Sequence, residues 1–343
     1  MKLKKIILYF LLLIVIGIAF CAWNIFGPVT QNPEKKFLYI PTGAVYQQVK
    51  DSLLKNNIIK GTFWFDKIAE NIEYPQKVKA GKYKIPEGMS LYHLLIMLHS
   101  GKQVPVKLVI TKLRTKEDLA KKIAGDFETD SLAVIHFLND TDSLKQFDVD
   151  TNTVLTDVIP NTYIFVWNTP MKKIFLKLYE EEQKFWNKER LEKAQQLQLT
   201  PQQVYTLASI VEEETNKQDD KGKIASVYIN RLRKGMKLAA DPTVKFALKD
   251  FGLKRIYNKY LETPSPFNTY LNKGLPPGPI CTPSIKTIDA VLDSPQTDYL
   301  FFVARSDFSG YSNFASTYQQ HQINAKAYQK ALDSLIKSKG QDQ

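Results

Sequence analysis

An unbroken apolar run near the N-terminus constrains this chain more than any other feature. It reads IILYFLLLIVIGIAFCAW and covers 18 residues, from Ile6 to Trp23. Extended to Phe26, a helix of this length spans roughly 30 Å at about 1.5 Å per residue, which matches the apolar thickness of a bilayer. The apolar core of a cleaved signal peptide is usually shorter, about 7–15 residues. We therefore expect an uncleaved transmembrane anchor over residues 6–26.

Basic residues predict the orientation of this anchor. Lys2, Lys4 and Lys5 lie in the N-terminal segment 1–5, and no Lys or Arg follows the run until Lys35. Segments rich in Lys and Arg stay on the cytoplasmic side of a membrane. We expect a single-pass protein of the cytoplasmic (inner) membrane, with a cytoplasmic N-terminus and the rest of the chain on the extracytoplasmic or periplasmic side. A signal peptide cleaved after "GIA" is the alternative.

Length and charge bound the remaining possibilities. A chain of 343 residues is too long for one compact core and predicts two or three domains. Its formal net charge of +12 indicates either a solvated Lys-rich surface or attraction to an acidic matrix. No nucleic-acid recognition motif or Gly-rich phosphate loop is present, so nucleic acid is not an expected partner. The histidines have no second ligand at metal spacing, so no metal site is predicted.

The chain after the anchor divides by pattern. Residues 27–36 carry Pro and Gly and are expected to form a linker. Residues 37–105 predict a small α+β domain of order strand–helix–helix–strand, with a last helix capped by Ser90 and ending near Gly101. With its turn GKYKIPEGMS this domain resembles a LysM-like glycan-binding domain. A domain that only packs is the alternative.

A connecting region, a second α+β domain and a tail complete the expected organisation. The connecting region covers residues 106–198. Its charged segment from Leu176 to Leu197 predicts one amphipathic helix whose charges form a solvated face. An α+β domain is expected over residues 199–335, and residues 336–343 form a polar tail.

The α+β domain expected over residues 199–335 opens with a helix that ends in three glutamates. Thr200, Pro201 and Gln203 form an N-terminal capping pattern, so the helix should begin at Pro201. Its apolar positions define one stripe, and at about 100° per residue Glu213 should point away from that stripe into solvent. Glu212 and Glu214 fall on opposite borders of the stripe. One of them could lie against an apolar wall, which would favour its protonated form.

Three segments follow the next predicted helix, AADPTV, TPSPFNTY and KGLPPGPI. The last two are expected to be rigid, Pro-rich loops that present Asn, Thr and Tyr side chains. Such side chains can hydrogen-bond sugar hydroxyls, and Tyr270 or Phe267 could stack on a pyranose ring. The simpler interpretation is structural punctuation by Pro and Gly.

Taken together, these segments resemble the endolytic murein transglycosylases, a family of YceG-like proteins. The matching segments are LASIVEEET, ASVYINRLRKGMKLAADPT, FNTY, GLPPGPI and YLFFVA, in family order between Leu207 and Tyr328. The resemblance implies that Glu212 is the catalytic acid. The supporting or substrate-binding candidates in the matched segments are Glu214, Asn230, Asp241, Thr243, Asn268, Tyr270, Leu275 and Pro276.

The chain also departs from the family pattern. Phe267 stands where the family often has Tyr, and Asn161 stands where it usually has Asp. Ser312 replaces a common His, so any role of that histidine cannot be carried over. His321 does match a position in the final helix of the family.

The resemblance implies an α+β enzyme that has one N-terminal transmembrane helix and a LysM-like domain. Its substrate would be peptidoglycan glycan strands, cut at the β-1,4 bond after N-acetylmuramic acid with a 1,6-anhydro product. One carboxylate suffices, because the C6 hydroxyl of the sugar is the nucleophile. No metal or cofactor is implied, and peptidoglycan synthases are a further partner class. The alternatives are a hydrolase using Glu212 with Asp241, a non-catalytic wall-binding scaffold, and a pyridoxal-phosphate lyase.

Overall fold

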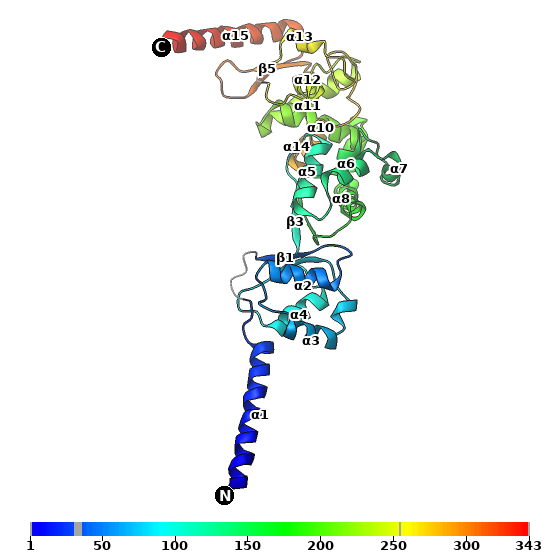
Figure 1. Cartoon of the computed structure of the whole chain (residues 1–343). Coiled ribbons are helices and arrows are strands. Elements are labelled where there is room, and N and C mark those ends of the chain that lie inside the picture. The colour runs from blue at the N-terminus through cyan, green and yellow to red at the C-terminus, as the bar shows by residue number, and fades with distance from the viewer. Residues whose placement is uncertain (1, 31–35, 254, 342–343) are drawn as a thin grey trace. The chain divides into compact units, whose positions relative to one another are not determined.

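The computed structural model describes residues 2–30, 36–253 and 255–341 and divides into two compact units (Figure 1). The N-terminal unit comprises Met1–Leu108, Ala124–Asp130 and Ile164–Pro170. The C-terminal unit comprises Val109–Ile123, Ser131–Tyr163 and Met171–Gln343. Both mix helices with short strands, in agreement with the α+β class. The described strands form three two-stranded sheets, β1–β2, β3–β4 and β5–β6.

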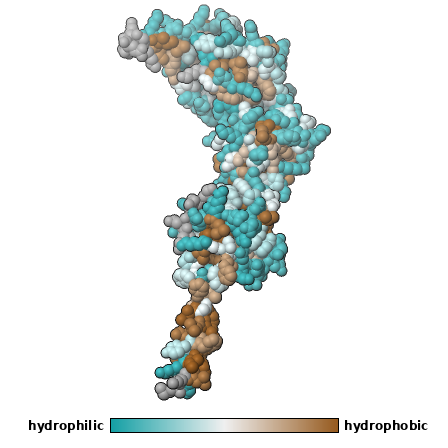
Figure 2. Space-filling view, in the orientation of Figure 1, coloured by the Kyte–Doolittle hydropathy of each residue, from teal (hydrophilic) through white to brown (hydrophobic). Residues whose placement is uncertain are grey.

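The apolar run forms helix α1 (Lys2–Phe26). Within it, Leu3–Phe26 is long and apolar enough to cross a membrane, and none of its most apolar window is buried. Figure 2 shows most of the surface of this helix as apolar (brown). The predicted anchor helix is therefore present and compatible with a single-pass span.

The rest of the N-terminal unit has the predicted order strand–helix–helix–strand. Its elements are β1 (Phe37–Ile40), α2 (Tyr46–Lys55), α3 (Phe63–Asn71), η1 (Tyr74–Gln76), β2 (Gly81–Lys84), α4 (Leu91–Ser100) and β3 (Val106–Val109). Strands β1 and β2 pair antiparallel, with Phe37 opposite Lys84 and Ile40 opposite Gly81. Because side chains alternate along a strand, Leu38 and Ile40 enter the core of this unit.

Helix α4 and the start of the predicted linker are joined by hydrogen bonds. The side chain of Ser90 accepts from the backbone N–H of His93, and Gly101 ends the helix at φ 73°, as predicted. The backbone N–H groups of Val29 and Thr30 donate to the carbonyl of Met89, at 3.1 and 3.2 Å. The beginning of the predicted linker is thus packed on the loop before α4, and residues 31–35 lie outside the described residues.

The C-terminal unit is mainly helical. The remaining helices are α5 (Lys116–Asp126), α6 (Ser131–Asn139), α7 (Thr141–Leu144), α8 (Met171–Phe185), α9 (Lys188–Leu197), α10 (Pro201–Glu214), α11 (Gln218–Arg233), α12 (Asp241–Leu248), α13 (Asn258–Leu261), α14 (Ile285–Leu292) and α15 (Tyr318–Gln341). The 3₁₀ turns η2 (Lys145–Phe147) and η3 (Val154–Asp157) and the strands β4 (Thr162–Phe165), β5 (Phe301–Ala304) and β6 (Ser312–Ala315) complete the list.

One predicted helix is wrong, because the segment Leu176–Leu197 is broken between α8 and α9. Asn187 caps α9 by accepting a hydrogen bond from the backbone N–H of Arg190, so the chain restarts a helix there. The charges of this segment are also not all solvated. Glu182 is buried, and Arg190 forms an ion pair with Asp289 of α14 at 2.8 Å.

Helix α10 is the core helix of the C-terminal unit. Its capping box is formed by Thr200 and Gln203, as predicted. Every residue from Val204 to Val211 is buried, and the helix packs against η3, α9, α11, α12 and α14. A helix that is buried on every side, rather than along one stripe, exposes side chains only near its ends. The three glutamates are at its C-terminal end.

Candidate functional site

Glu212 is held by donors from two other helices. Its Oε2 accepts hydrogen bonds from Lys221 Nζ of α11 at 2.8 Å, from Ser284 Oγ at 3.1 Å and from Thr287 Oγ1. Lys221 Nζ also donates to Thr287 Oγ1 at 2.6 Å. Ser284 is the N-cap of α14, so the first turn of that helix faces the carboxylate. The Glu212 side chain is 16% exposed and that of Lys221 is 8% exposed.

These donors decide the charge of Glu212. Burial alone would raise the pKa of its carboxyl group, but the hydrogen bonds from Lys221, Thr287 and Ser284 outweigh burial and hold the pKa below its usual value. Of the two border glutamates, Glu212 is therefore not the one that favours its protonated form. The wall at this position carries a lysine, and Glu212 is ionised at neutral pH.

Glu213 does not point into solvent, which corrects the second expectation for this helix. Its side chain is 16% exposed and forms ion pairs with Lys112 at 3.0 Å and Arg114 at 3.1 Å. The segment that carries these cations is fixed by Thr282, whose N–H donates to the carbonyl of Leu113 at 2.7 Å. The prediction assumed one buried stripe, whereas α10 is covered on all sides.

Glu214 is the glutamate whose pKa lies near neutral pH. Burial raises its pKa to about 7, and the nearby charge of Asp241 acts in the same direction. The hydrogen bond that Tyr228 donates to its Oε1, at 2.6 Å, lowers the pKa in part. The expectation that one of the two border glutamates favours its protonated form thus holds for Glu214.

Asp241 and Tyr270 lie beside Glu214. Asp241 opens α12, and its Oδ1 accepts a hydrogen bond from the Tyr270 hydroxyl at 2.6 Å. Burial and this bond raise the pKa of Tyr270, so its hydroxyl stays protonated. Among the predicted residues, the structure therefore brings together Glu214, Asp241 and Tyr270.

Thr243 and Asn268 shape the loop that presents Tyr270. Thr243 Oγ1 lies 2.9 Å from Thr269 Oγ1 and donates to the carbonyl of Ala240 at 2.6 Å. Asn268 Nδ2 donates to the carbonyls of Leu261 and Thr263, both at 2.9 Å, and its Oδ1 accepts from the N–H of Tyr270. Both side chains are fully buried, so they act through the loop.

Other predicted residues lie away from the glutamates. Asn230 Nδ2 donates to the carbonyls of Thr297 and Tyr299, at 2.8 and 3.0 Å, and so holds the segment before β5. Leu275 and Pro276 line a pocket of about 540 Å³ together with Gln202 and Gln203 of the first turn of α10. That turn is about 18 Å from Glu214 along the helix at 1.5 Å per residue.

Three further residues singled out in the sequence, Phe267, Ser312 and His321, contact other side chains of the C-terminal unit. Phe267 packs against Phe246, with ring centroids 4.7 Å apart. The ring that could stack on a sugar is therefore already in contact with another aromatic side chain. The backbone N–H of Ser312 donates to Asp220 at 2.6 Å. The ring of His321 stacks on Phe301, and burial lowers its pKa.

Sequence reasoning missed the partners of the glutamates. Lys221 and Thr287 are 9 and 75 positions from Glu212, and Lys112 and Arg114 are about a hundred positions from Glu213. A signal for the burial of α10 was present, since its eight residues from Val204 to Val211 include no charged side chain. The identity of each partner depends on tertiary packing.

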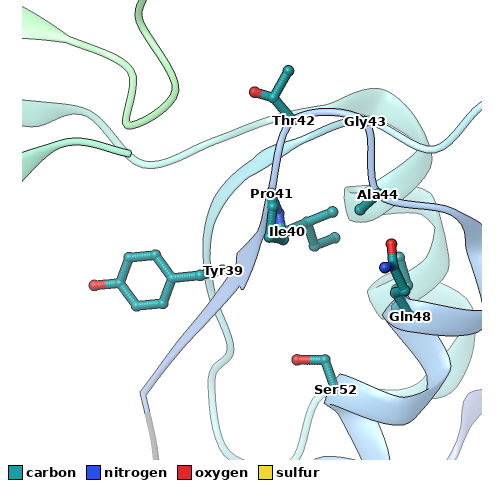
Figure 3. A pocket seen from close by; sticks show the side chains of 9 residues that line it. Tyr39, Ile40, Pro41, Thr42, Gly43, Ala44, Gln48 and Ser52 are labelled. Atoms are coloured by element: carbon teal, nitrogen blue, oxygen red, sulfur yellow. The ribbon is translucent and has the colours of Figure 1, made fainter. Parts of the chain in front are cut away.

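The N-terminal unit has a pocket of its own, about 410 Å³ in volume (Figure 3). It is lined by the end of β1, the following loop and one face of α2. Ile40 points toward α2, where Gln48 and Ser52 lie, and Tyr39 points away. Glu128 fixes the loop by accepting from the N–H and the hydroxyl of Thr42, both at 2.6 Å. The pocket combines apolar walls with amide and hydroxyl groups.

Across residues 2–30, 36–253 and 255–341, no group of three or more His, Cys, Asp or Glu side chains is placed to hold a metal ion.

Comparisons with known proteins agree with the segments that carry the glutamates. The model of the YceG-like family matches residues 38–327. An endolytic murein transglycosylase of Bacillus subtilis is 30% identical over 96% of this chain and 93% of its own length. One from Streptococcus pneumoniae is 27% identical over 87% of this chain, which spans 59% of that relative. A solved structure of a yceG-like protein from Listeria monocytogenes aligns with a TM-score of 0.56 at 28% identity, over 84% of this chain and 97% of that one.

Proposed function

We propose that this chain, which belongs to the YceG-like family, is a lytic transglycosylase of peptidoglycan. It cuts the β-1,4 bond between N-acetylmuramic acid and N-acetylglucosamine within glycan strands and leaves 1,6-anhydromuramic ends. Its biological role is to terminate or trim strands as they are made. The observation that carries the proposal is the C-terminal turn of α10, where a buried helix delivers Glu212 into a ring of hydrogen-bond donors.

Glu212 is the proposed catalytic residue. It protonates the glycosidic oxygen as the bond to the ring carbon breaks, and the bond electrons stay on the leaving oxygen. The carboxylate then takes the proton of the C6 hydroxyl as that oxygen attacks the ring carbon, so the proton count of Glu212 is restored. Neither step requires a second carboxylate or an activated water molecule.

The lowered pKa of Glu212 sets a condition on the first step. In the free protein at neutral pH Glu212 is a carboxylate, so it must gain a proton before it can donate one. A glycan strand that covers the site removes water from the carboxylate, and desolvation favours the protonated form. Cleavage should therefore become faster as the pH falls from neutral, until other carboxylates of the fold are protonated.

Glu214 and its neighbours support the site in this proposal. Glu214, Asp241 and Tyr270 form a polar cluster on the loop side of α10 that offers hydrogen-bond partners for sugar hydroxyls. A specific observation also keeps a hydrolase as the second candidate. Asp241 raises the pKa of Glu214, so these two acids are near one another and could be the two carboxylates of a hydrolase. The predicted pair, Glu212 with Asp241, has no such support, because no hydrogen bond among the described residues joins Asp241 to Glu212.

The N-terminal parts place the enzyme at its substrate in this proposal. Helix α1 anchors the chain in the cytoplasmic membrane with the N-terminus inside, because its flanking lysines precede the apolar run. The LysM-like domain holds glycan in the pocket between the β1–α2 loop and α2. Peptidoglycan synthases are the partner class that supplies nascent strands.

Product analysis tests the proposal. Full-length protein in detergent is incubated with purified glycan strands, and the products are identified by mass spectrometry, with Glu212→Gln as the control. Anhydro ends that depend on Glu212 are the expected result. Reducing ends without anhydro ends would identify the hydrolase. Strand binding without either product would identify a scaffold.

A further inference from the structure

The two oxygens of Glu212 have unequal surroundings. All of its hydrogen bonds with described residues go to Oε2, from Lys221, Ser284 and Thr287. Oε1 accepts none of them, and the side chain keeps 16% of its surface exposed. A carboxylate fixed through one oxygen exposes the other in a defined direction.

Lys221 is unusual among the lysines of this chain. Its side chain is 8% exposed, and its Nζ bridges Glu212 Oε2 and Thr287 Oγ1. An exposed ion pair contributes little to stability, and a buried one is weak evidence for stability because desolvation opposes it. A buried lysine on a proposed catalytic carboxylate therefore suggests a role in the reaction.

The remaining titratable groups near this end of α10 have other partners or stay neutral. They include Glu213, Glu214, Lys112, Arg114, Asp220, Tyr228, Arg231, Asp241 and Cys281. The two cations before α5 pair with Glu213, and burial raises the pKa of the Cys281 thiol, which stays neutral. Lys221 is therefore the cation that acts directly on Glu212 within the described residues.

We propose that Lys221 is a positioning residue for the cleavage, which rests on the proposed function. It clamps Oε2 together with Thr287 and Ser284, so that Oε1 is the atom that exchanges the proton with the glycan. It also stabilises the carboxylate that Glu212 becomes when the glycosidic bond breaks. Lys221 transfers no proton in either step, so the proton balance of the reaction is unchanged.

The consequence is a specific pH dependence. Without the lysine, burial of the carboxyl group remains while its strongest opposing interaction is lost, so the pKa of Glu212 rises. Lys221→Met should move the pH at which cleavage declines upward by about one unit or more and lower kcat more than it changes KM. Lys221→Arg keeps the charge and a donor, and its profile should stay near that of the wild type.

Two measurements on the full-length protein in detergent test this. The first is the pH–rate profile of anhydro-product release for wild type, Lys221→Met, Lys221→Arg and Lys177→Met. Lys177 pairs with Glu181 on α8, outside the site, and is the matched control. The second is infrared difference spectroscopy of the protonated carboxyl band that Glu212→Gln removes, which does not require activity.

The outcomes separate the two proposals. The inference is supported if, in Lys221→Met but not in Lys177→Met, both the decline of cleavage and the loss of the carboxyl band move to higher pH. If the band of a folded Lys221→Met protein is lost at the same pH as in the wild type, the inference is overturned. Wild-type protein that releases no anhydro product defeats the proposed function, while the infrared result still decides the role of Lys221. If Lys221→Met does not fold, Thr287→Val removes another donor to Oε2 and must shift the band in the same direction.

Discussion

Glu212, Glu213 and Glu214 are adjacent in sequence, but each contacts a different part of the C-terminal unit. At about 100° per residue, consecutive helix positions face different neighbours, here Lys221, the pair Lys112 and Arg114, and Tyr228. One carboxyl group is ionised by its donors, and one has a pKa of about 7 because it is buried. Single substitutions should therefore have separable effects.

Glu212→Gln should nearly abolish cleavage. Glutamine preserves the size of the side chain but cannot transfer a proton, and a general acid or base contributes about 10²–10⁴-fold. The rate of anhydro-product release should fall by at least about 100-fold. Glu214→Gln should lie between this variant and wild type, because it loses an interaction with Tyr228 rather than the proton donor. Retention of more than a tenth of the rate by Glu212→Gln would transfer the role to Glu214.

Glu213→Gln should affect stability rather than chemistry. The change removes two ion pairs to a side chain that is 16% exposed, and we expect a loss of about 1–2 kcal/mol in the free energy of unfolding. Urea denaturation measures it. Glu181→Gln is the control, because Glu181 also pairs with two lysines but is 30% exposed. Equal losses in both variants would show that burial of Glu213 adds nothing.

At the scale of elements, local signals in the sequence predict where helices begin, but they do not predict which helix faces other elements cover. The capping residues Thr200 and Ser90 predicted the starts of α10 and α4, because a side-chain cap is an interaction within one turn. The solvent exposure of Glu213 was predicted wrongly. A helical wheel shows which residues share a face, but it does not show how many faces are covered. Similarly, Asn187 caps α9 and so begins a second helix inside the segment for which one continuous helix was predicted.

Two buried acids lie near each other on two elements outside the proposed site. Asp157 of η3 and Glu182 of α8 are 3% and 6% exposed, and no ion pair links either to a cation in the described chain. Burial raises the pKa of Asp157 to about 8, with a further contribution from Glu182. Burial likewise raises the pKa of Glu182 to about 7.

The stability of the C-terminal unit should therefore decrease as the pH rises. In the unfolded chain both groups lose their protons near pH 4, while in the fold they keep them to higher pH. Their stabilising contribution is complete below about pH 4 and is lost as the pH rises through 7 to 8. Thermal unfolding between pH 5 and 8 should show this slope, and Asp157→Asn should flatten it. An unchanged slope in Asp157→Asn and in Glu182→Gln would contradict the assignment.

At the scale of the whole molecule, the apolar helix α1 is long and apolar enough to anchor the chain in a membrane. We expect the mature protein in the membrane fraction to keep its N-terminus, because the apolar run is too long for an ordinary cleaved signal. Mass spectrometry of the intact protein checks this. A mature chain that begins at Phe20, directly after the "GIA" motif, would be inconsistent with an anchor.

The pocket of the N-terminal unit should contribute to strand binding. Gln48 and Gln47 are consecutive exposed residues of α2, but only Gln48 lines the pocket. Gln48→Trp should fill the pocket and weaken binding of long strands severalfold, with little change in the products formed. Gln47→Trp adds the same bulk outside the pocket and should bind as wild type does. Sedimentation with purified strands measures the difference, and equal binding by both variants would assign the unit a packing role.

The end of α10 also has an electrostatic consequence. The last four carbonyl groups of a helix have no partner within it, and the carboxyl end of the helix dipole is negative. Here three acids are added to that end, and no basic residue of α10 lies in its last turn. The cations that pair with Glu212 and Glu213 offset those two charges, so the negative end of the helix dipole itself is what remains to favour a developing cation. Glycosidic cleavage creates positive charge on the sugar ring in its transition state. The helix would therefore bind the ring more tightly at that moment than before it, which is a requirement for catalysis.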